Sequence, residues 1–216
     1  MKRNFVIAIG IVGSLLTLGV AGPANAAKDS GAEVDDSNPG WYAVAPATGE
    51  VFVPGETDIW ANTESEPGTV SPMLLDSADW WECHSNNNSN WVIVDYPFWW
   101  DGIEKTMKLQ CGVAADYGWF HIRDGHMKQW KNRITQATPN ANTDPWDNLM
   151  WWGATGALDY SYSSSGPTSG KLCVTTQIDM YNTSTQQYVY TFYPTYSWSL
   201  TNDRLITGYP SSNPDC

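Results

Sequence analysis

Two of the chain's three histidines, His121 and His126, lie five residues apart in the segment GWFHIRDGHMKQW, which runs from Gly118 to Trp130. Histidine is well suited to accept and donate protons near neutral pH, so such a pair can supply both the general base and the general acid of a hydrolysis. This region is also the most basic of the chain, with Arg123, Lys128, Lys131 and Arg133. The segment is therefore the candidate catalytic element. The alternative is that its histidines are structural and its basic residues form a solvated helix face.

The element that must position these histidines is a predicted helix of residues 117–136, which ends before Pro139. At about 100° per residue, His126 shares a face with the apolar side chains, whereas His121 points about 140° away. The apolar side chains of that face are Trp119, Ile122, Trp130 and Ile134. The spacing excludes the i, i+4 pair with which two helical histidines bind zinc. It predicts one histidine toward the core and one toward solvent, unless Gly125 loosens the turn before His126.

Two motifs at the ends of the region 112–210 resemble a known family. CGVAADYGWFHIRDGHMKQW is similar to the Gly-aromatic-x-His-Ile-x-x-x-His segment that opens certain small nuclease domains, and RLITGYPSSNPDC is similar to their last strand, with Thr-x-Tyr-Pro. These are the RNase-like C-terminal domains of contact-dependent-inhibition proteins and other polymorphic toxins of bacteria. The family usually has a basic residue before its second histidine, where this chain has Gly125.

The resemblance implies a barnase-like RNase fold and a metal-independent endoribonuclease that needs no cofactor. It implies these catalytic residues: His121 and His126 as acid and base, Thr207 and Tyr209 in the same cleft, and Arg204 as a phosphate contact. Arg123 and Lys128 are the expected substrate-binding residues. RNA is the expected substrate, and a protein inhibitor is a further candidate partner.

The tryptophans support a different function. The chain has 13, among them the adjacent pairs Trp80-Trp81, Trp99-Trp100 and Trp151-Trp152. If such pairs lie on strands, one member faces outward, where an indole can stack on a sugar. The alternative hypothesis is therefore a non-catalytic protein that binds cell-wall or other polysaccharide. A glycosidase would need two flanking carboxylates, for which the candidates are Glu82 with Asp101 or Asp95 with Glu104.

The first residues predict export. Lys2 and Arg3 precede an apolar stretch of residues 5–20, and Ala24-Asn25-Ala26 is a typical cleavage site, so residues 1–26 are expected to be a signal peptide. Residues 27–40 are expected to be a flexible acidic leader. The mature protein is predicted to be secreted, monomeric and free of the membrane. Its nine basic and 23 acidic residues give a net charge of −14, which repels phosphate backbones outside a local basic patch.

Four cysteines in an exported chain predict two disulfides, for which three connectivities exist. We expect Cys83–Cys111 and Cys173–Cys216, because each pair brackets one compact block of sequence. A zinc site is disfavoured because no two cysteines are closely spaced.

The remaining pattern predicts a single α+β domain over 41–216. Its part 41–111 reads as strands and loops, with brief strands in 41–60, a loop at 62–71 and a hairpin in 90–112 that turns at Asp101-Gly102 and is interrupted at Pro97. The RNase-like part 112–216 contains a second helix at 143–158, a connector at 161–170 and a C-terminal antiparallel sheet. The expected strands of that sheet are 171–181, 186–201 and 204–210. The helices are expected to pack on one face of the sheet.

Overall fold

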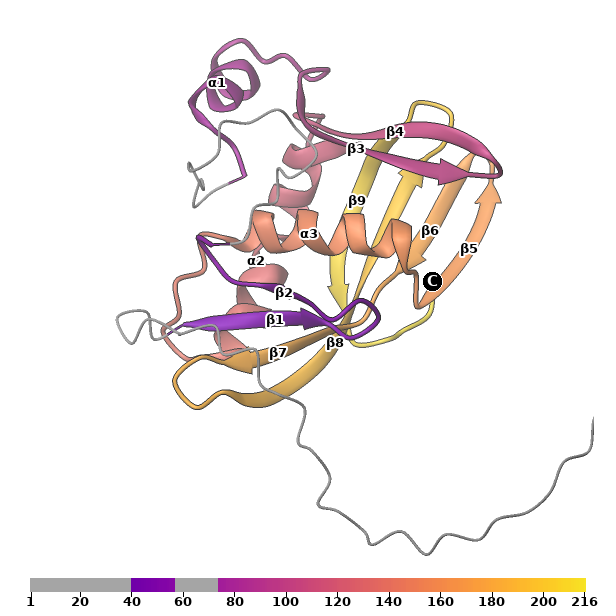
Figure 1. The fold of residues 1–216 in the computed structure, drawn as a ribbon. Helices are drawn as coiled ribbons and strands as arrows, with labels where there is room; N and C mark the ends of the chain where they lie inside the picture. Colours follow the sequence, from indigo (N-terminus) through magenta and orange to yellow (C-terminus); the bar gives the residue numbers. More distant parts are fainter. Residues whose placement is uncertain (1–39, 57–73) are drawn as a thin grey trace, which may run out of the picture. The chain divides into compact units, whose positions relative to one another are not determined.

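The computed structural model describes residues 40–56 and 74–216 (Figure 1). The expected signal peptide, the leader up to residue 39 and the expected loop 62–71 lie outside the described residues. None of the described helices combines the length and the apolar character that a membrane crossing requires. The described part contains both helices and a many-stranded sheet, so the α+β class is confirmed.

The strand-rich part begins with a short hairpin and a helical segment. The strands are β1 (Trp41–Ala45) and β2 (Glu50–Phe52), and the helical turns are α1 (Ser77–Trp80) and the π-helical η1 (Trp81–Ser85). The side chain of Asp76 accepts a hydrogen bond from the backbone N of Asp79, and the side chain of Asp79 accepts one from the backbone N of Asp76. This reciprocal capping box starts a helix at a place where no helix was expected from the sequence.

The central hairpin is as predicted. It consists of β3 (Val92–Trp100) and β4 (Ile103–Gln110), joined by Asp101 and Gly102, whose φ angles of 51° and 75° suit a two-residue turn. The expected interruption at Pro97 was wrong, because Pro97 pairs regularly with Thr106 and the register shift lies between Val92 and Val94.

Both predicted helices are present, and the C-terminal strands differ in detail. The helices are α2 (Gly118–Ala137) and α3 (Trp146–Asp159). The strands that follow are β5 (Ser163–Thr168), β6 (Lys171–Thr175), β7 (Ile178–Asn182), β8 (Gln187–Ser199) and β9 (Arg204–Ser211). The expected connector 161–170 therefore contains a strand, and the expected strand 171–181 is two strands. β8 explains the division, because its first half pairs with β7 and its second half with β6.

The sheet corrects the expectation of helices followed by a separate C-terminal sheet. Its nine strands include the order β2-β1-β7-β8-β9-β4-β3, with β6 beside β8 and β5 beside β6. The early strands β1 and β4 thus pair with the late strands β7 and β9, and the β4–β9 pairing is parallel. The sheet is therefore mixed and includes strands from before the helices. Short-range sequence patterns cannot predict such pairings between distant parts of the chain.

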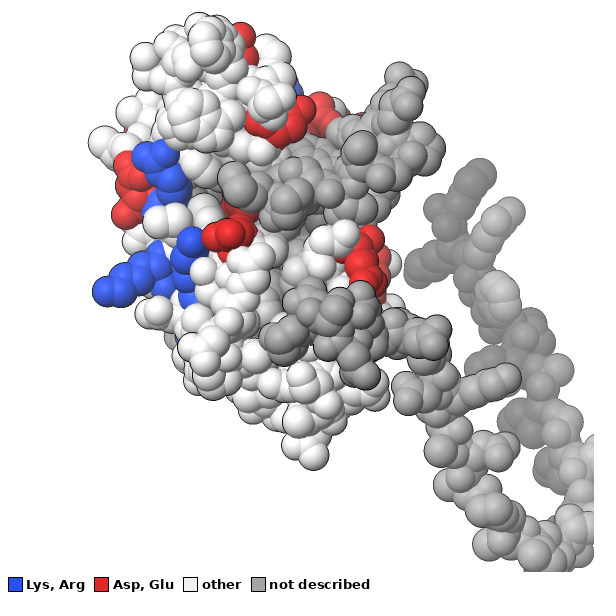
Figure 2. All heavy atoms as spheres, turned by 90° about the vertical axis from the view of Figure 1, so that its left-hand side faces the viewer, with Lys and Arg blue, Asp and Glu red and all other residues white. Residues whose placement is uncertain are grey.

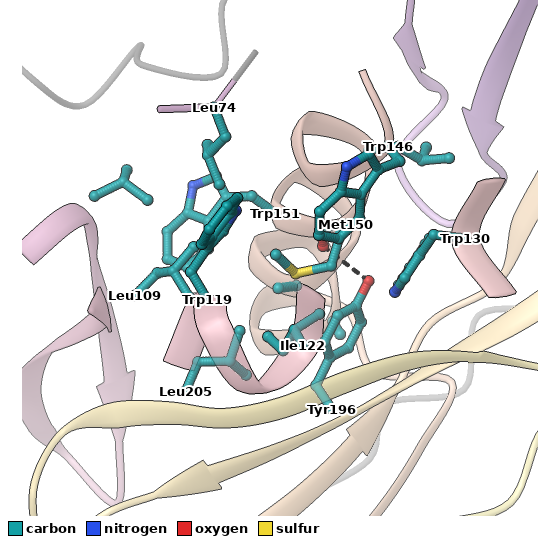
Figure 3. Packing of buried hydrophobic residues seen from close by; sticks show 14 of the residues in the cluster. Leu74, Leu109, Trp119, Ile122, Trp130, Trp146, Met150, Trp151, Tyr196 and Leu205 are labelled. Atoms are coloured by element: carbon teal, nitrogen blue, oxygen red, sulfur yellow. Dashed lines mark hydrogen bonds between the residues drawn. The ribbon is translucent and has the colours of Figure 1, made fainter. Parts of the chain in front are cut away.

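The core lies between the two helices and the sheet (Figure 3). Tyr196 of β8 points toward α3, where its hydroxyl donates a hydrogen bond to the Met150 carbonyl at 3.0 Å. Gly153 makes this approach possible, because a Cβ there would lie 2.4 Å from the Tyr196 hydroxyl. Trp130 of α2 packs its ring beside Tyr196 with a centroid distance of 6.4 Å. The aromatic side chains therefore fix both helices on the same face.

Both predicted disulfides are confirmed. Cys83–Cys111 joins η1 to the segment that leads into α2, and Cys173–Cys216 joins β6 to the C-terminal residue. They close loops with sequence separations of 28 and 43 residues. On the chain-entropy model, loops of this length contribute about 3–4 kcal/mol each to the free energy of unfolding.

Candidate functional site

A tight loop before α2 places His121. Gly112 and Gly118 have positive φ angles, and a Cβ on Gly112 would lie 1.9 Å from the Tyr117 carbonyl oxygen. The chain can therefore close the loop only because these residues are glycines. The closed loop directs the Ala114 carbonyl at the His121 ring, whose Nδ1 lies 2.9 Å from that oxygen.

The two histidine rings lie together. Both side chains are half-buried, and their ring centroids are 6.0 Å apart at an interplanar angle of 80°. The expectation that one would face the core and the other solvent was therefore wrong. Helical side chains lean toward the helix N-terminus, so the His126 ring extends back toward His121 across the four intervening positions.

Each histidine has its Nδ1 in use. The Ala114 carbonyl can only accept, so His121 Nδ1 carries a proton and donates it there. His126 Nδ1 lies 3.3 Å from Gln129 Oε1, one turn further along α2. A hydrogen bond at one ring nitrogen sets the tautomer and orients the ring, which leaves both Nε2 atoms for chemistry.

His126 also contacts the last strand. Its ring centroid lies 5.4 Å from that of Tyr209 on β9. Burial lowers the pKa of His126 below its ordinary value of 6.5, and the nearby His121 lowers this pKa further. The hydrogen bond that the ring donates to Gln129 Oε1 opposes this change. The neutral form of His126 is thus favoured, as a general base requires.

A bulge in β9 arranges the remaining residues expected to be catalytic. Ser197 pairs with Thr207, whereas the next residue of β8, Trp198, pairs with Leu205, so Ile206 is an extra residue. Side chains alternate along a strand, and the bulge shifts this alternation by one position. Consequently, three side chains share one face of β9: Arg204, Thr207 and Tyr209.

The structure brings these three residues to different neighbours. The Arg204 guanidinium lies 3.5 Å from the centroid of the Tyr117 ring, directly before α2. The Thr207 hydroxyl oxygen is buried and has no hydrogen-bond partner within the described part of the chain. Tyr209 alone is seen against a histidine ring. The contact of Tyr117 with Arg204 was not predicted from the sequence. The position of Tyr117 directly before the histidine helix was the one feature that could have indicated it.

The two expected substrate-binding residues, Arg123 and Lys128, both lie on α2 but have different surroundings. Arg123 pairs with Asp124 at 2.6 Å, and its Nη1 lies 3.2 Å from Nε2 of His84, the third histidine. Lys128 is exposed. Figure 2 shows Lys and Arg side chains gathered on one face of the molecule, with Asp and Glu side chains beside them. The basic side chains of this face thus lie among acidic ones, and Arg123 and Lys131 form ion pairs with Asp124 and Asp144.

Of the carboxylate pairs considered for glycoside hydrolysis, Asp95 and Glu104 do not form a site. Asp95 and Glu104 are four pair positions apart on the β3–β4 hairpin, about 13 Å along the strands. Glycosidase carboxyl groups lie no more than about 9.5 Å apart. Glu82 accepts hydrogen bonds from Asn86 and Asn88 of its own segment. Within residues 40–56 and 74–216, no group of three His, Cys, Asp or Glu residues could hold a metal ion.

One buried carboxyl has a stabilising role and a shifted pKa. Asp147 of α3 accepts hydrogen bonds from Trp119 Nε1 at 3.2 Å and from the backbone N of Leu74 and of Asn148. Burial raises the pKa of Asp147 from 3.8 to about 6, an effect that these hydrogen bonds oppose. The side chain lies beneath α2 in the core and is inaccessible to a substrate.

This shift predicts a pH-dependent stability. Because the folded-state pKa of Asp147 is raised, its stabilising contribution is full below pH 3.8 and is lost as the pH rises through about 6. The difference in unfolding free energy between the wild type and Asp147→Asn should thus fall by about 3 kcal/mol from pH 3.5 to pH 7. Urea unfolding of both proteins at several pH values measures this difference, and a constant difference would contradict the prediction.

The site therefore combines two imidazoles and a tyrosine, an arrangement that can move protons. Arg204 lies apart from them, over Tyr117. Comparison with known proteins gave no match among family models, curated proteins or solved structures. The chemical character of these side chains is what indicates the function.

Proposed function

We propose that this protein is a secreted hydrolase that cleaves RNA by acid–base catalysis without a metal ion. The observation that carries the proposal is the pair His121 and His126, whose ring centroids lie 6.0 Å apart while each Nδ1 is held by a hydrogen-bond acceptor. In the proposal the two rings serve different oxygens of one phosphodiester unit, each of which a catalytic nitrogen approaches to about 2.6–3.2 Å. The two disulfides fit an oxidising compartment outside the cell.

The reaction divides between the two rings. Neutral His126 accepts the proton of the ribose 2′-hydroxyl, and the 2′-oxygen attacks the adjacent phosphorus. Protonated His121 donates its Nε2 proton to the departing 5′-oxygen, so the P–O5′ bond breaks as the P–O2′ bond forms. The products are a 2′,3′-cyclic phosphate and a 5′-hydroxyl, and a proton exchange with water restores both histidines.

The remaining side chains supply positioning and charge. In this proposal the hydroxyl of Tyr209, beside the His126 ring, hydrogen-bonds a phosphate oxygen. Arg204 contacts phosphate once it leaves its position over Tyr117, and Lys128 adds positive charge on the exposed side of α2. Thr207 lies on the same face of β9, between Arg204 and Tyr209. The barnase-like architecture stays a prediction, since strands β1 to β4 precede the histidine helix. A protein inhibitor likewise stays a prediction.

The test is RNA cleavage by the secreted, disulfide-bonded protein in the presence of EDTA. We expect an oligoribonucleotide to yield 2′,3′-cyclic phosphate ends, while the same sequence as DNA stays intact because it lacks the attacking hydroxyl. The rate should follow a bell-shaped pH profile whose acidic limb lies below pH 6.5, since burial lowers the pKa of His126. Loss of cleavage with EDTA, or equal cleavage of DNA, would exclude the proposed reaction.

A second candidate function, non-catalytic binding of polysaccharide, is favoured by one surface. On the face of the sheet away from the helices, the rings of Tyr42, Tyr181 and Tyr188 form a continuous row, with centroid distances of 4.9 and 5.9 Å. Beside them, Thr191 donates a hydrogen bond to Asp179 at 2.6 Å. Tyrosines next to polar groups suit a sugar chain. A protein that leaves RNA intact and sediments with an insoluble polysaccharide would support this function instead.

A further inference from the structure

An exposed tryptophan is held in a fixed orientation beside the start of α2. The Trp80 ring stacks on the ring of His84 with a centroid distance of 4.0 Å and an interplanar angle of 12°. His84 in turn meets the rings of Trp119 and Phe120 edge-on, at 5.7 and 5.1 Å. Trp80 nevertheless remains 48% exposed. The indole is therefore supported on one side and open to solvent, as a stacking surface must be.

A cation lies at the edge of this stack. The Arg123 guanidinium is 4.6 Å from the centroid of Phe120 and 5.0 Å from that of Trp119. Its Nη1 lies 3.2 Å from His84 Nε2, and His84 Nδ1 lies 3.3 Å from the Trp80 carbonyl oxygen. The guanidinium can only donate, so His84 Nε2 accepts and Nδ1 donates. Arg123 thus fixes the ring on which Trp80 stacks.

The backbone beneath the stack is also constrained. Trp80 ends α1, and the disulfide Cys83–Cys111 ties the following turn to the segment before α2. The backbone N of Phe120 donates to the Cys111 carbonyl at 2.9 Å, which continues the connection into the helix. A surface that is ordered before binding loses little conformational entropy on binding.

We propose that Trp80, His84 and Arg123 form a base-stacking subsite for single-stranded RNA, a proposal that rests on the proposed function. An open aromatic face binds a nucleobase without sequence preference, and a neighbouring arginine binds the phosphate that accompanies it. Arg123 and His121 both lie on α2, but residues two apart on a helix point to different sides of it. In this proposal an RNA strand therefore bends around the start of α2 to place one base on Trp80 and a phosphate at the histidine pair. A neutral polysaccharide would use the indole but not the cation.

The experiment compares Trp80→Ala with a matched control, Trp99→Ala. Trp99 is 71% exposed but lies at the tip of the β3–β4 hairpin. The value of kcat/KM is measured for a hexaribonucleotide and for a dinucleotide, which occupies only the two positions on either side of the cleaved bond. We expect the ratio of the two values to fall about 5- to 100-fold in Trp80→Ala, the range for loss of one base stack. The control should keep the wild-type ratio.

Binding of a non-cleavable 2′-O-methyl hexanucleotide, followed by tryptophan fluorescence, separates this proposal from the proposed catalysis. Weaker binding by Trp80→Ala and by Arg123→Gln, with unchanged binding by Trp99→Ala, supports the subsite even if no RNA is cleaved. Cleavage by the wild type combined with an unaltered ratio and unaltered binding in Trp80→Ala overturns the subsite alone. If Trp80→Ala instead keeps its binding to RNA and loses binding to a polysaccharide such as chitin, Trp80 binds a sugar and the proposal of an RNA subsite is wrong.

Discussion

Replacing His126 with alanine should abolish detectable RNA cleavage, with a fall in kcat/KM of about 10²–10⁴-fold. In the proposed reaction His126 is the general base, and its neutral form is favoured because burial lowers its pKa. The free energy of unfolding should change by less than about 1 kcal/mol, because the ring is half-buried and its hydrogen bond joins Gln129 of the same helix. Single-turnover kinetics and urea unfolding of the same preparations measure both quantities.

Two further variants make this result specific. His121→Gln should lose cleavage to a similar extent, since an amide cannot donate the proton that the leaving oxygen requires. Asn132→Ala, an exposed position on the same helix, should keep the wild-type rate. If the wild type is inert on RNA and His126→Ala is less stable by about 1–3 kcal/mol, His126 is a structural residue and the enzymatic hypothesis fails.

Local patterns were sufficient for much of the fold. The turn at Asp101-Gly102, the helix that carries both histidines and the alternating strands near the C-terminus were all predictable, because each depends on neighbours in sequence. Both disulfides were also predictable, since each pair of cysteines encloses a compact block. The helical turn at Ser77–Trp80 was missed, although Asp76 and Asp79 already carry the capping-box spacing.

Long-range pairings and side-chain directions were not predictable. Nothing in the sequence near Trp41 indicates that it pairs with Asn182, so the mixed sheet was not foreseen. The ideal helix placed His121 and His126 on different sides, because an angular projection ignores how side chains lean along the helix axis. The bulge at Ile206 was equally hidden, although it decides which residues share a face with Tyr209.

Trp130 is the residue on which the candidate site depends most for its geometry. It is fully buried on α2, and its Nε1 donates a hydrogen bond to the Gly208 carbonyl of β9 at 3.1 Å. Gly208 precedes Tyr209, and Trp130 lies one turn after His126. The bond therefore holds the helix that carries the histidines against the strand that carries the tyrosine.

Trp130→Ala should destabilise the fold by about 3–5 kcal/mol, because it removes a large buried ring and leaves a cavity beside Phe192 and Tyr196. Trp130→Phe keeps most of the packing but leaves the Gly208 carbonyl without this donor, which should cost about 1–3 kcal/mol. Under conditions in which Trp130→Phe is fully folded, its rate of RNA cleavage should still fall, because His126 and Tyr209 lose their common support. Trp99→Phe, an exposed substitution of the same kind, should alter neither quantity. Trp130→Phe could instead unfold at the same urea concentration as the wild type and cleave RNA at the same rate. In that case the hydrogen bond from Trp130 to Gly208 does not position the site, and the placement of α2 on β9 depends on the apolar packing alone.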